Sequence, residues 1–283
     1  MLKNHIIVGN GKWAKKIILF LKKYKIAKQI LIISRKKKFI SHPNYKKLNK
    51  NDFTNILKHS ETAHICSSNK SHLKYFNFFS KQNINFIIEK PIVNNLKELK
   101  KIKLNYKSKY LVNYIDLFNY DFGKIYGLLN KNKNKKTSIT IIYSNHLHRY
   151  KKKQQLFESW LDHPLAIILF LKKKFSNFKV IKFESNRDKK GKFNQNLEVE
   201  YKFNKIKTKF IITNNSSKIR KIEIQTILKK YHFDLGRKIS PQKSSFYRLY
   251  KNLNDIDNSL FKFKLNFNKK ILKEKKKVLE AIN

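Results

Sequence analysis

Residues 5–14 read His-Ile-Ile-Val-Gly-Asn-Gly-Lys-Trp-Ala, and this stretch decides the fold of the first part of the chain. Its apolar start is typical of a buried strand, and the periodic apolar residues over 12–24 predict an amphipathic helix. Between them lies the pattern Gly-x-Gly-x-x-Ala, with Gly9, Gly11 and Ala14 at the small positions. Such a turn leaves the strand sharply, keeps side chains off the backbone at Gly11 and allows close helix packing at Ala14. It places the first N–H groups of a helix where a pyrophosphate can bind.

The chain has 283 residues, of which 41% are hydrophobic, so it is long enough for two ordinary domains with real cores. It contains no apolar run near the 18 residues or so that a membrane-spanning helix needs. We find no signal segment before the first strand. The single cysteine, Cys66, cannot form an internal disulfide, and we interpret it as a small buried residue. These features predict a cytoplasmic protein without membrane contact.

The formal net charge of +48 would by itself suggest a nucleic-acid partner. Arginine, however, accounts for only six of the 66 basic residues. Nucleic-acid-binding proteins are rich in arginine, because its planar guanidinium group forms two hydrogen bonds at once to a phosphate or a base edge. The lysines are also spread along the whole chain. We attribute the charge chiefly to genome composition and keep a basic nucleic-acid-binding protein as an alternative.

The first part of the chain alternates strand and helix, which predicts a parallel sheet covered by helices on both faces. The expected strands are 5–8, 30–34, 63–67, 85–89 and 110–114. The expected helices are 12–24, 52–59, 71–81 and 96–104. The predicted fold class is therefore α/β, with an amino-terminal doubly wound Rossmann sheet over 1–116.

After residue 116 the pattern changes to longer strands with one polar face, for example 197–203, where apolar and polar residues alternate. The expected strands are 137–143, 178–184, 197–203, 208–213 and 219–227. The expected helices are 163–173 and 269–282. We predict a second α+β domain over 117–283, with a predominantly antiparallel sheet that binds substrate and other subunits.

The residues that follow the second expected strand indicate which dinucleotide binds. An NAD site usually carries an acidic residue there for the ribose 2′-hydroxyl. This chain has Ser34 and Arg35 instead, which can hydrogen-bond and pair with a 2′-phosphate. NADP is therefore preferred over NAD. The residues of the first turn expected to contact the cofactor are Gly9, Asn10, Gly11, Lys12 and Trp13.

A second cluster combines the strand 63–67, His72 at the start of a helix, and the strand 85–89 that ends in Glu89-Lys90-Pro91. Together with the opening glycine turn, this cluster resembles the glucose-fructose oxidoreductase and inositol dehydrogenase family (Gfo/Idh/MocA). The resemblance covers the first 120 residues well and the remainder more loosely. It implies hydride transfer between a nicotinamide cofactor and a hydroxyl-bearing carbon of a sugar, cyclitol or nucleotide-sugar.

By this resemblance Lys90 contacts both substrate and cofactor near the reacting carbon, where an ammonium group can stabilise a developing alkoxide. Pro91 would fix the turn that aims it, and Glu89 would orient or neutralise locally. Further expected cofactor contacts are Ser67, Asn69 and His72, and Asn113 is an expected substrate contact. An equally weighted alternative for His72 is a purely structural role at the helix start.

The family's second signature is an aspartate four residues before a histidine that exchanges the hydroxyl proton. His163 matches the histidine, but Ser159 stands at the aspartate position, with Glu158 and Asp162 nearby. Three interpretations remain open: His163 acts with Lys90 alone, Asp162 or Glu158 supplies the carboxylate, or the protein binds cofactor without efficient turnover. Asp162 is also a good helix N-cap.

His146 and His148 form a His-x-His pair, but no third ligand stands at a suggestive spacing, so we expect no metal. Arg149 could clamp a carboxylate or phosphate of the substrate, and Tyr247 with Arg248 could contribute similarly. The resemblance also implies a homo-oligomer, because such second domains often pair subunits.

Overall fold

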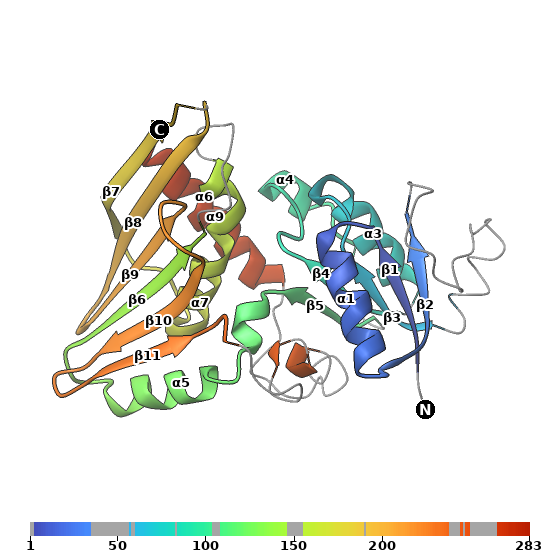
Figure 1. The fold of residues 1–283 in the computed structure, drawn as a ribbon, viewed down its shortest axis with the longest axis horizontal. Coiled ribbons are helices and arrows are strands. Elements are labelled where there is room, and N and C mark those ends of the chain that lie inside the picture. Colours follow the sequence, from blue (N-terminus) through green and yellow to red (C-terminus); the bar gives the residue numbers. More distant parts are fainter. Residues whose placement is uncertain are drawn as a thin grey trace. The chain divides into compact units, whose positions relative to one another are not determined.

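The computed structural model (Figure 1) describes residues 3–34, 57, 60–82, 84–103, 108–145, 155–189, 191–237, 244–245, 247–249 and 265–283. The chain divides into two compact units. Unit 1 comprises Met1–Tyr114 with Leu249–Lys269, and unit 2 comprises Ile115–Arg248 with Lys270–Asn283. The expected boundary after residue 116 therefore lies close to the end of the first segment of unit 1. No helix among the described residues is long and apolar enough to cross a lipid bilayer.

Unit 1 is built on a five-stranded parallel sheet in the order β2-β1-β3-β4-β5. The strands are β1 (Lys3–Val8), β2 (Ala27–Ile33), β3 (Ser60–Ile65), β4 (Asn85–Glu89) and β5 (Tyr110–Asn113). The helices are α1 (Lys12–Lys23), α3 (Asn69–Lys81) and the short α4 (Leu96–Leu99). From β1 the chain runs to β2 at one edge of the sheet, and from β3 it runs through β4 to β5 at the other edge. Because both crossovers are right-handed, α1 and α3 lie on opposite faces of the sheet.

The core of unit 1 forms where these helices meet the sheet. Ala14 of α1 is fully buried, and the apolar stripe of that helix continues through Ile17 and Leu21. On the other face, Phe76 of α3 packs edge-on against Phe86 of β4 at a centroid distance of 5.0 Å. Burial on both sides explains why the strands read as continuous apolar runs.

Unit 2 is built on a six-stranded sheet in the order β11-β10-β6-β9-β8-β7. The strands are β6 (Thr137–Ser144), β7 (Phe178–Arg187), β8 (Phe193–Phe203), β9 (Ile206–Thr213), β10 (Ile219–Gln225) and β11 (Lys230–Asp234). Only β6 and β9 pair in parallel, and all other neighbours are antiparallel. The predicted fold class is thus confirmed for both sheets.

Helices of unit 2 cover one face of this sheet, as Figure 1 shows for α6 and α7. The elements are the 3-10 helix η1 (Ile115–Phe118), α5 (Phe122–Lys131), α6 (Gln155–Trp160), α7 (Asp162–Lys172) and, from Lys270 onward, α9 (Leu265–Glu280). Alternate strand residues are buried beneath them, including Tyr143, Leu197 and Phe210. Most of the polar residues of β8, β9 and β10 lie on the opposite face.

Several expected elements differ from the observed ones. The strand expected at 63–67 is β3 at Ser60–Ile65, which leaves Ser67 in the following loop. The helix expected at 96–104 ends at Leu99. Sequence patterns did not predict α5, α6 or β11; α5 contains two glycines, which lower helix propensity. The helix expected at 52–59 lies outside the described residues, except for Leu57.

Candidate functional site

A pocket of about 430 Å³ opens in unit 1 where β1, β2 and β3 end. Gly9, Asn10 and Gly11 line it from the end of β1, Ser34 from the end of β2, and Ser67 from the end of β3. β1 and β3 are neighbours from which the chain winds in opposite directions. Ligands of doubly wound sheets bind outside the carboxyl ends of the strands at this switch point.

The two glycines of the first turn have different surroundings. Gly9 has φ +112°, and a β-carbon there would stand 2.7 Å from the carbonyl oxygen of Cys66. The backbone N–H of Cys66 donates to the carbonyl of Val8 at 2.8 Å, which holds the two chains together. A β-carbon on Gly11 would meet no heavy atom within 4 Å. Gly9 is therefore required by the fold, whereas Gly11 borders open space in the pocket.

Two helices begin at this pocket. Gly11 is the N-cap of α1 and Ser68 is the N-cap of α3; neither helix has a side-chain cap bond or an acidic residue in its first turn. The Ser71 hydroxyl donates to the Ser67 side chain at 2.8 Å within α3's first turn. Helix N-termini carry partial positive charge and donor N–H groups, so two of them at one pocket favour an anion such as a diphosphate.

The residues of the pocket fit a dinucleotide. The open space at Gly11 suits close approach of a pyrophosphate to the backbone, with Asn10 in the same turn, whereas Lys12 and Trp13 are the first residues of α1 and do not line the pocket. Ser34 lines the pocket at the end of β2, and Asn69 is the exposed first residue of α3. Arg35, the second residue expected to select NADP, lies outside the described residues.

Glu89 is the last residue of β4 and pairs with Asn113 at the end of β5, and Lys90 and Pro91 follow it. Asn113 donates from Nδ2 to Oε1 of Glu89. Burial raises the pKa of Glu89 to about 8, although the Asn113 hydrogen bond and the charge of Lys90 lower it. Burial also raises the pKa of the Cys66 thiol, and the charge of Glu89 adds to this shift. Cys66 is therefore a neutral thiol at the pocket wall.

Asn113 is buried, and among the described residues its Oδ1 atom has no hydrogen-bond partner. Buried amide oxygens are nearly always paired, so an unpaired one beside Glu89 needs an explanation. A donor group of a bound ligand would provide the missing partner. Asn113 thus fits a contact residue at the carboxyl end of the sheet.

His72 is fully buried in α3 and ties two loops together. Its Nδ1 lies 2.7 Å from the carbonyl oxygen of Pro91, and its Nε2 lies 3.0 Å from that of Ser67. Burial lowers the pKa of His72, and these two hydrogen bonds oppose the shift. His72 therefore positions the loop after β3 and the turn after Lys90.

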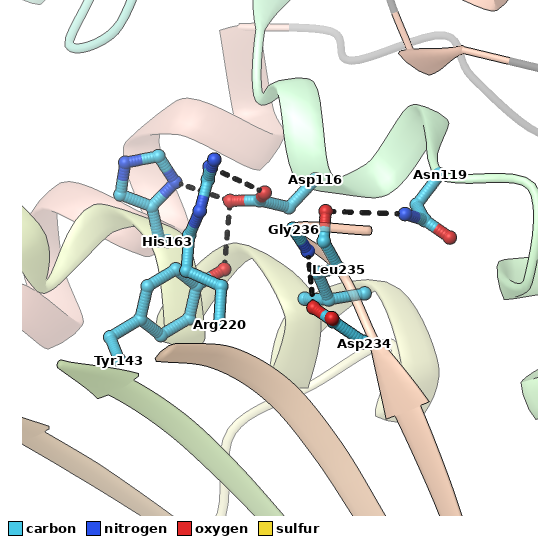
Figure 2. A network of polar contacts seen from close by, with 8 residues as sticks. All are labelled: Asp116, Asn119, Tyr143, His163, Arg220, Asp234, Leu235 and Gly236. Atoms are coloured by element: carbon cyan, nitrogen blue, oxygen red, sulfur yellow. Dashed lines mark hydrogen bonds and ion pairs between the residues drawn. The ribbon is translucent and has the colours of Figure 1, made fainter. Parts of the chain in front are cut away.

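A second polar cluster lies in unit 2, where three side chains meet the carboxylate of Asp116 (Figure 2). His163 Nδ1 lies 2.8 Å from Oδ2, and the Tyr143 hydroxyl donates to the same oxygen at 2.8 Å. Arg220 donates to Oδ1 at 3.1 Å. Burial alone would raise the pKa of Asp116, but His163, Arg220 and Tyr143 together hold it at about 2. Asp116 is therefore a buried, ionised carboxylate.

The fold brings these residues together from four elements. Asp116 belongs to η1, which is separated from the end of β5 by one residue, and His163 is the second residue of α7. Tyr143 of β6 and Arg220 of β10 are partners in the antiparallel register. The Tyr143 and His163 rings also stack, with centroids 5.3 Å apart. His163 remains 17% exposed, so its ring is partly accessible.

The other acidic candidates lie elsewhere in unit 2. Both carboxylate oxygens of Asp162 accept from Lys275 of α9, at 3.1 and 3.2 Å. The same ammonium donates to the backbone carbonyl of Glu158 at 2.5 Å. Ser159 lies in α6, four residues before His163. The carboxylate that contacts the His163 ring thus comes from Asp116.

Of the remaining candidates, Arg149, His146 and His148 lie outside the described residues. Arg248 donates to the backbone carbonyl of Asn119 at 2.8 Å, and Tyr247 is 38% exposed. The described residues contain no group of three or more potential metal ligands.

Sequence reasoning missed Asp116, Tyr143 and Arg220. Arg220 is one of only six arginines in a lysine-rich chain, and this was a usable signal, because a guanidinium suits a buried carboxylate better than an ammonium does. Asp116 lies three residues after the end of the last strand of the first sheet, which is a second signal. No sequence signal marked Tyr143, because its position in the apolar pattern is that of an ordinary core residue of a strand.

Comparisons with known proteins agree with this architecture. Residues 3–116 match the family model of the Gfo/Idh/MocA oxidoreductases, described as having an NAD-binding Rossmann fold. No curated protein sequence matches the chain. Three solved structures share its fold: a myo-inositol dehydrogenase from Corynebacterium glutamicum, a myo-inositol 2-dehydrogenase from Lactobacillus plantarum and a Gfo/Idh/MocA family oxidoreductase from Vibrio cholerae.

The first superimposes with a TM-score of 0.78 and 12% identity over 99% of this chain and 96% of that one. The second superimposes with a TM-score of 0.75 and 11% identity over 100% of this chain and 98% of that one. The third superimposes with a TM-score of 0.70 and 10% identity over 99% of both chains. At such low identities these likenesses establish the fold alone.

Proposed function

We propose that the chain is an NAD(P)-dependent oxidoreductase acting on a CH–OH group, because residues 3–116 match the family model of the Gfo/Idh/MocA oxidoreductases. The proposed substrate is a sugar, cyclitol or nucleotide-sugar, and two of the structurally similar proteins are called myo-inositol dehydrogenases. The observation that carries the proposal is the pocket at the switch point, with open space at Gly11 and the start of α1 beside it.

Two residues of this chain would handle the substrate oxygen. The nicotinamide cofactor, when bound, exchanges a hydride with the substrate carbon. Lys90 would stabilise negative charge developing on the oxygen, as an ammonium group does at an alkoxide. His163 would accept or return the hydroxyl proton, since imidazole exchanges protons near neutral pH. Glu89 and His72 would hold the Lys90 turn, and Arg149 would contact the substrate.

NADP is the proposed preferred cofactor. Ser34 lies at the pocket and no acidic residue stands at 34–38 of the sequence, so nothing there selects the free 2′-hydroxyl of NAD. The charge of +48 would further attract the more anionic dinucleotide at low salt. We place the enzyme in the cytoplasm, where a single unpaired cysteine is ordinary.

A homo-oligomer is the proposed assembly. The outer face of the second sheet carries Glu198, Glu200 and Glu223, each paired with a lysine, in a chain with only 18 acidic residues. Near them Ile142 and Ile211 are cross-strand neighbours and are partly exposed. Both signs of charge around an apolar centre suit self-association far better than an all-lysine surface does. Sedimentation of Ile211→Lys, compared with the wild type, tests this surface.

One alternative keeps the cofactor site but not the turnover. Ser159 stands where the family places an aspartate, and this observation favours a cofactor-binding protein with a regulatory role. Titration with NADPH and NADH, followed by turnover assays on a panel of polyols and nucleotide-sugars, separates the two. Binding with turnover that is lost in both Lys90→Ala and His163→Ala supports the enzyme. Binding without turnover supports the alternative, and salt-dependent nucleic-acid binding that displaces NADPH would support the basic nucleic-acid-binding protein.

A further inference from the structure

The missing aspartate before His163 leaves open what sets the protonation of that ring. A neutral imidazole carries its proton on one nitrogen, and the hydrogen bond of that nitrogen decides which one. In this chain the position four residues earlier is Ser159, and Asp162 is bound to Lys275 through both oxygens. The carboxylate in contact with the ring is that of Asp116.

We propose that Asp116 is the positioning residue for His163: it holds the ring proton on Nδ1 and leaves Nε2 as the atom that exchanges a proton with substrate. The kinetic part of this inference rests on the proposed oxidoreductase function. The assignment of the tautomer rests only on the geometry of unit 2.

The geometry requires Asp116 to act as an acceptor. The Tyr143 hydroxyl and His163 Nδ1 both point at Oδ2, and Arg220 points at Oδ1, as Figure 2 shows. Arg220 can only donate, and its positive charge favours the ionised carboxylate, which has no hydrogen of its own to give to His163. With Oδ2 as acceptor, Nδ1 of His163 must carry the hydrogen.

The neighbours of Asp116 also keep it ionised. Among the residues that the structure describes, the polar groups in contact with it are Tyr143 from β6, His163 from α7 and Arg220 from β10. These are two potential cations and one hydroxyl donor. The network therefore favours both the charge of Asp116 and an Nδ1–H on His163.

The arrangement has the logic of a carboxylate–histidine pair. The carboxylate fixes the ring orientation and stabilises the imidazolium that forms when Nε2 takes a proton. The ring of His163 is further held by its stacking on Tyr143. Asp116 belongs to η1, so the carboxylate reaches the ring from a different segment of the chain than α6, which contains Ser159.

The decisive measurement is the tautomer of His163 in the protein without cofactor or substrate. Protein labelled with ¹⁵N-histidine is examined by long-range ¹H–¹⁵N correlation over a pH series, and the tautomer is read on the alkaline plateau of the ring ¹⁵N shifts. His163→Gln assigns the resonance. We expect the pattern of a ring protonated on Nδ1. An Nε2–H pattern in the wild-type protein would overturn the proposal, and this measurement needs no variant of Asp116.

Asp116→Asn then tests the cause, because an amide has nearly the same shape but no longer demands a proton on Nδ1. We expect mixed tautomers in this variant, and the wild-type pattern in the control Asp121→Asn, which changes a surface acid paired with Lys124. An unchanged pattern in folded Asp116→Asn, or a loss of the Nδ1–H pattern in Asp162→Asn instead, would contradict the assignment.

Turnover, where it is established, gives a second readout. We expect Asp116→Asn to lower kcat by about 10²-fold or more while the Kd for NADPH stays within about twofold, and to shift the pH profile of kcat. A fall in kcat without change in its pH profile would indicate a merely structural role. The tautomer is read without cofactor, so failure of the oxidoreductase proposal and failure of this one give different results.

Discussion

Gly9 and Cys66 approach so closely that a β-carbon on Gly9 would stand 2.7 Å from the Cys66 carbonyl oxygen. This contact joins the end of β1 to the loop after β3 at the mouth of the pocket. Gly11 is only two positions further on, yet its surroundings are open. A glycine is therefore required at position 9 for folding, whereas the missing side chain at Gly11 leaves room for a ligand.

Gly9→Ala should destabilise the protein strongly, whereas Gly11→Ala should not. The left-handed backbone at Gly9 alone costs about 1–3 kcal/mol for a residue with a side chain, and the clash with Cys66 adds to it. Gly11→Ala should change the free energy of unfolding by less than about 1 kcal/mol but weaken NADPH binding. Urea unfolding and fluorescence titration measure the two effects. Equal destabilisation by both substitutions would contradict this division of roles.

Ser34→Asp should reverse the cofactor preference. A carboxylate there repels the 2′-phosphate of NADP and accepts a hydrogen bond from the 2′-hydroxyl of NAD. We expect the ratio of the NADPH and NADH dissociation constants to shift by about tenfold or more, which corresponds to about 1.4 kcal/mol. Ser217→Asp, at an exposed loop position, controls for the added charge and should leave that ratio unchanged. An unaltered ratio in Ser34→Asp would exclude a ribose contact at this residue.

The fold of unit 1 was predictable because local signals and tertiary structure agree there. The strand at Asn85–Glu89 and the start of α1 at Lys12 match the expected bounds, since apolar runs and the glycine turn mark both. The switch-point pocket follows from the same pattern. α5 was missed because Gly123 and Gly127 weaken its helical signal, and only packing onto unit 2 identifies it as a helix.

The candidate site was predictable only in part. Residues next to one another in sequence, such as Gly9 and Gly11, were found because spacing alone defines their turn. The contact of Asp116 with His163 and Arg220 joins positions far apart along the chain, and no periodicity encodes such a meeting. Sequence proximity to His163 instead suggested Asp162 and Glu158. Lys275 donates to the side chain of Asp162 and to the backbone carbonyl of Glu158.

Asp116 should give the protein a specific dependence on acid. Its pKa is lowered from 3.8 to about 2 in the folded state, so it stabilises the fold above pH 3.8 and this contribution is lost as the pH falls through 2. The shift corresponds to about 2 kcal/mol. Urea unfolding of the wild type and of Asp116→Asn from pH 6 downward should show curves that converge in acid. A constant difference across that range would rule out the ionised carboxylate.

Ionisation of Glu89 should affect the pH dependence of stability in the opposite direction from that of Asp116. Its pKa is raised from 4.5 to about 8 by burial, so the folded state prefers the protonated acid and loses stability as the pH rises from 4.5 through 8. Glu89→Gln keeps an oxygen for the Asn113 amide but cannot ionise. We expect this variant to gain stability relative to the wild type as the pH rises to 9. Glu280→Gln, at an exposed helix end, should show no such trend. Parallel pH curves for Glu89→Gln and the wild type would refute the shift.

The central claim is that the first turn of the chain binds the diphosphate of a nicotinamide dinucleotide against backbone N–H groups. A crystal structure of the NADPH complex tests it most directly. The account predicts the diphosphate over Gly11 at the start of α1, with the adenosine ribose beside Ser34. A cofactor bound elsewhere, or a first-turn pocket that stays empty at saturating NADPH, would contradict it.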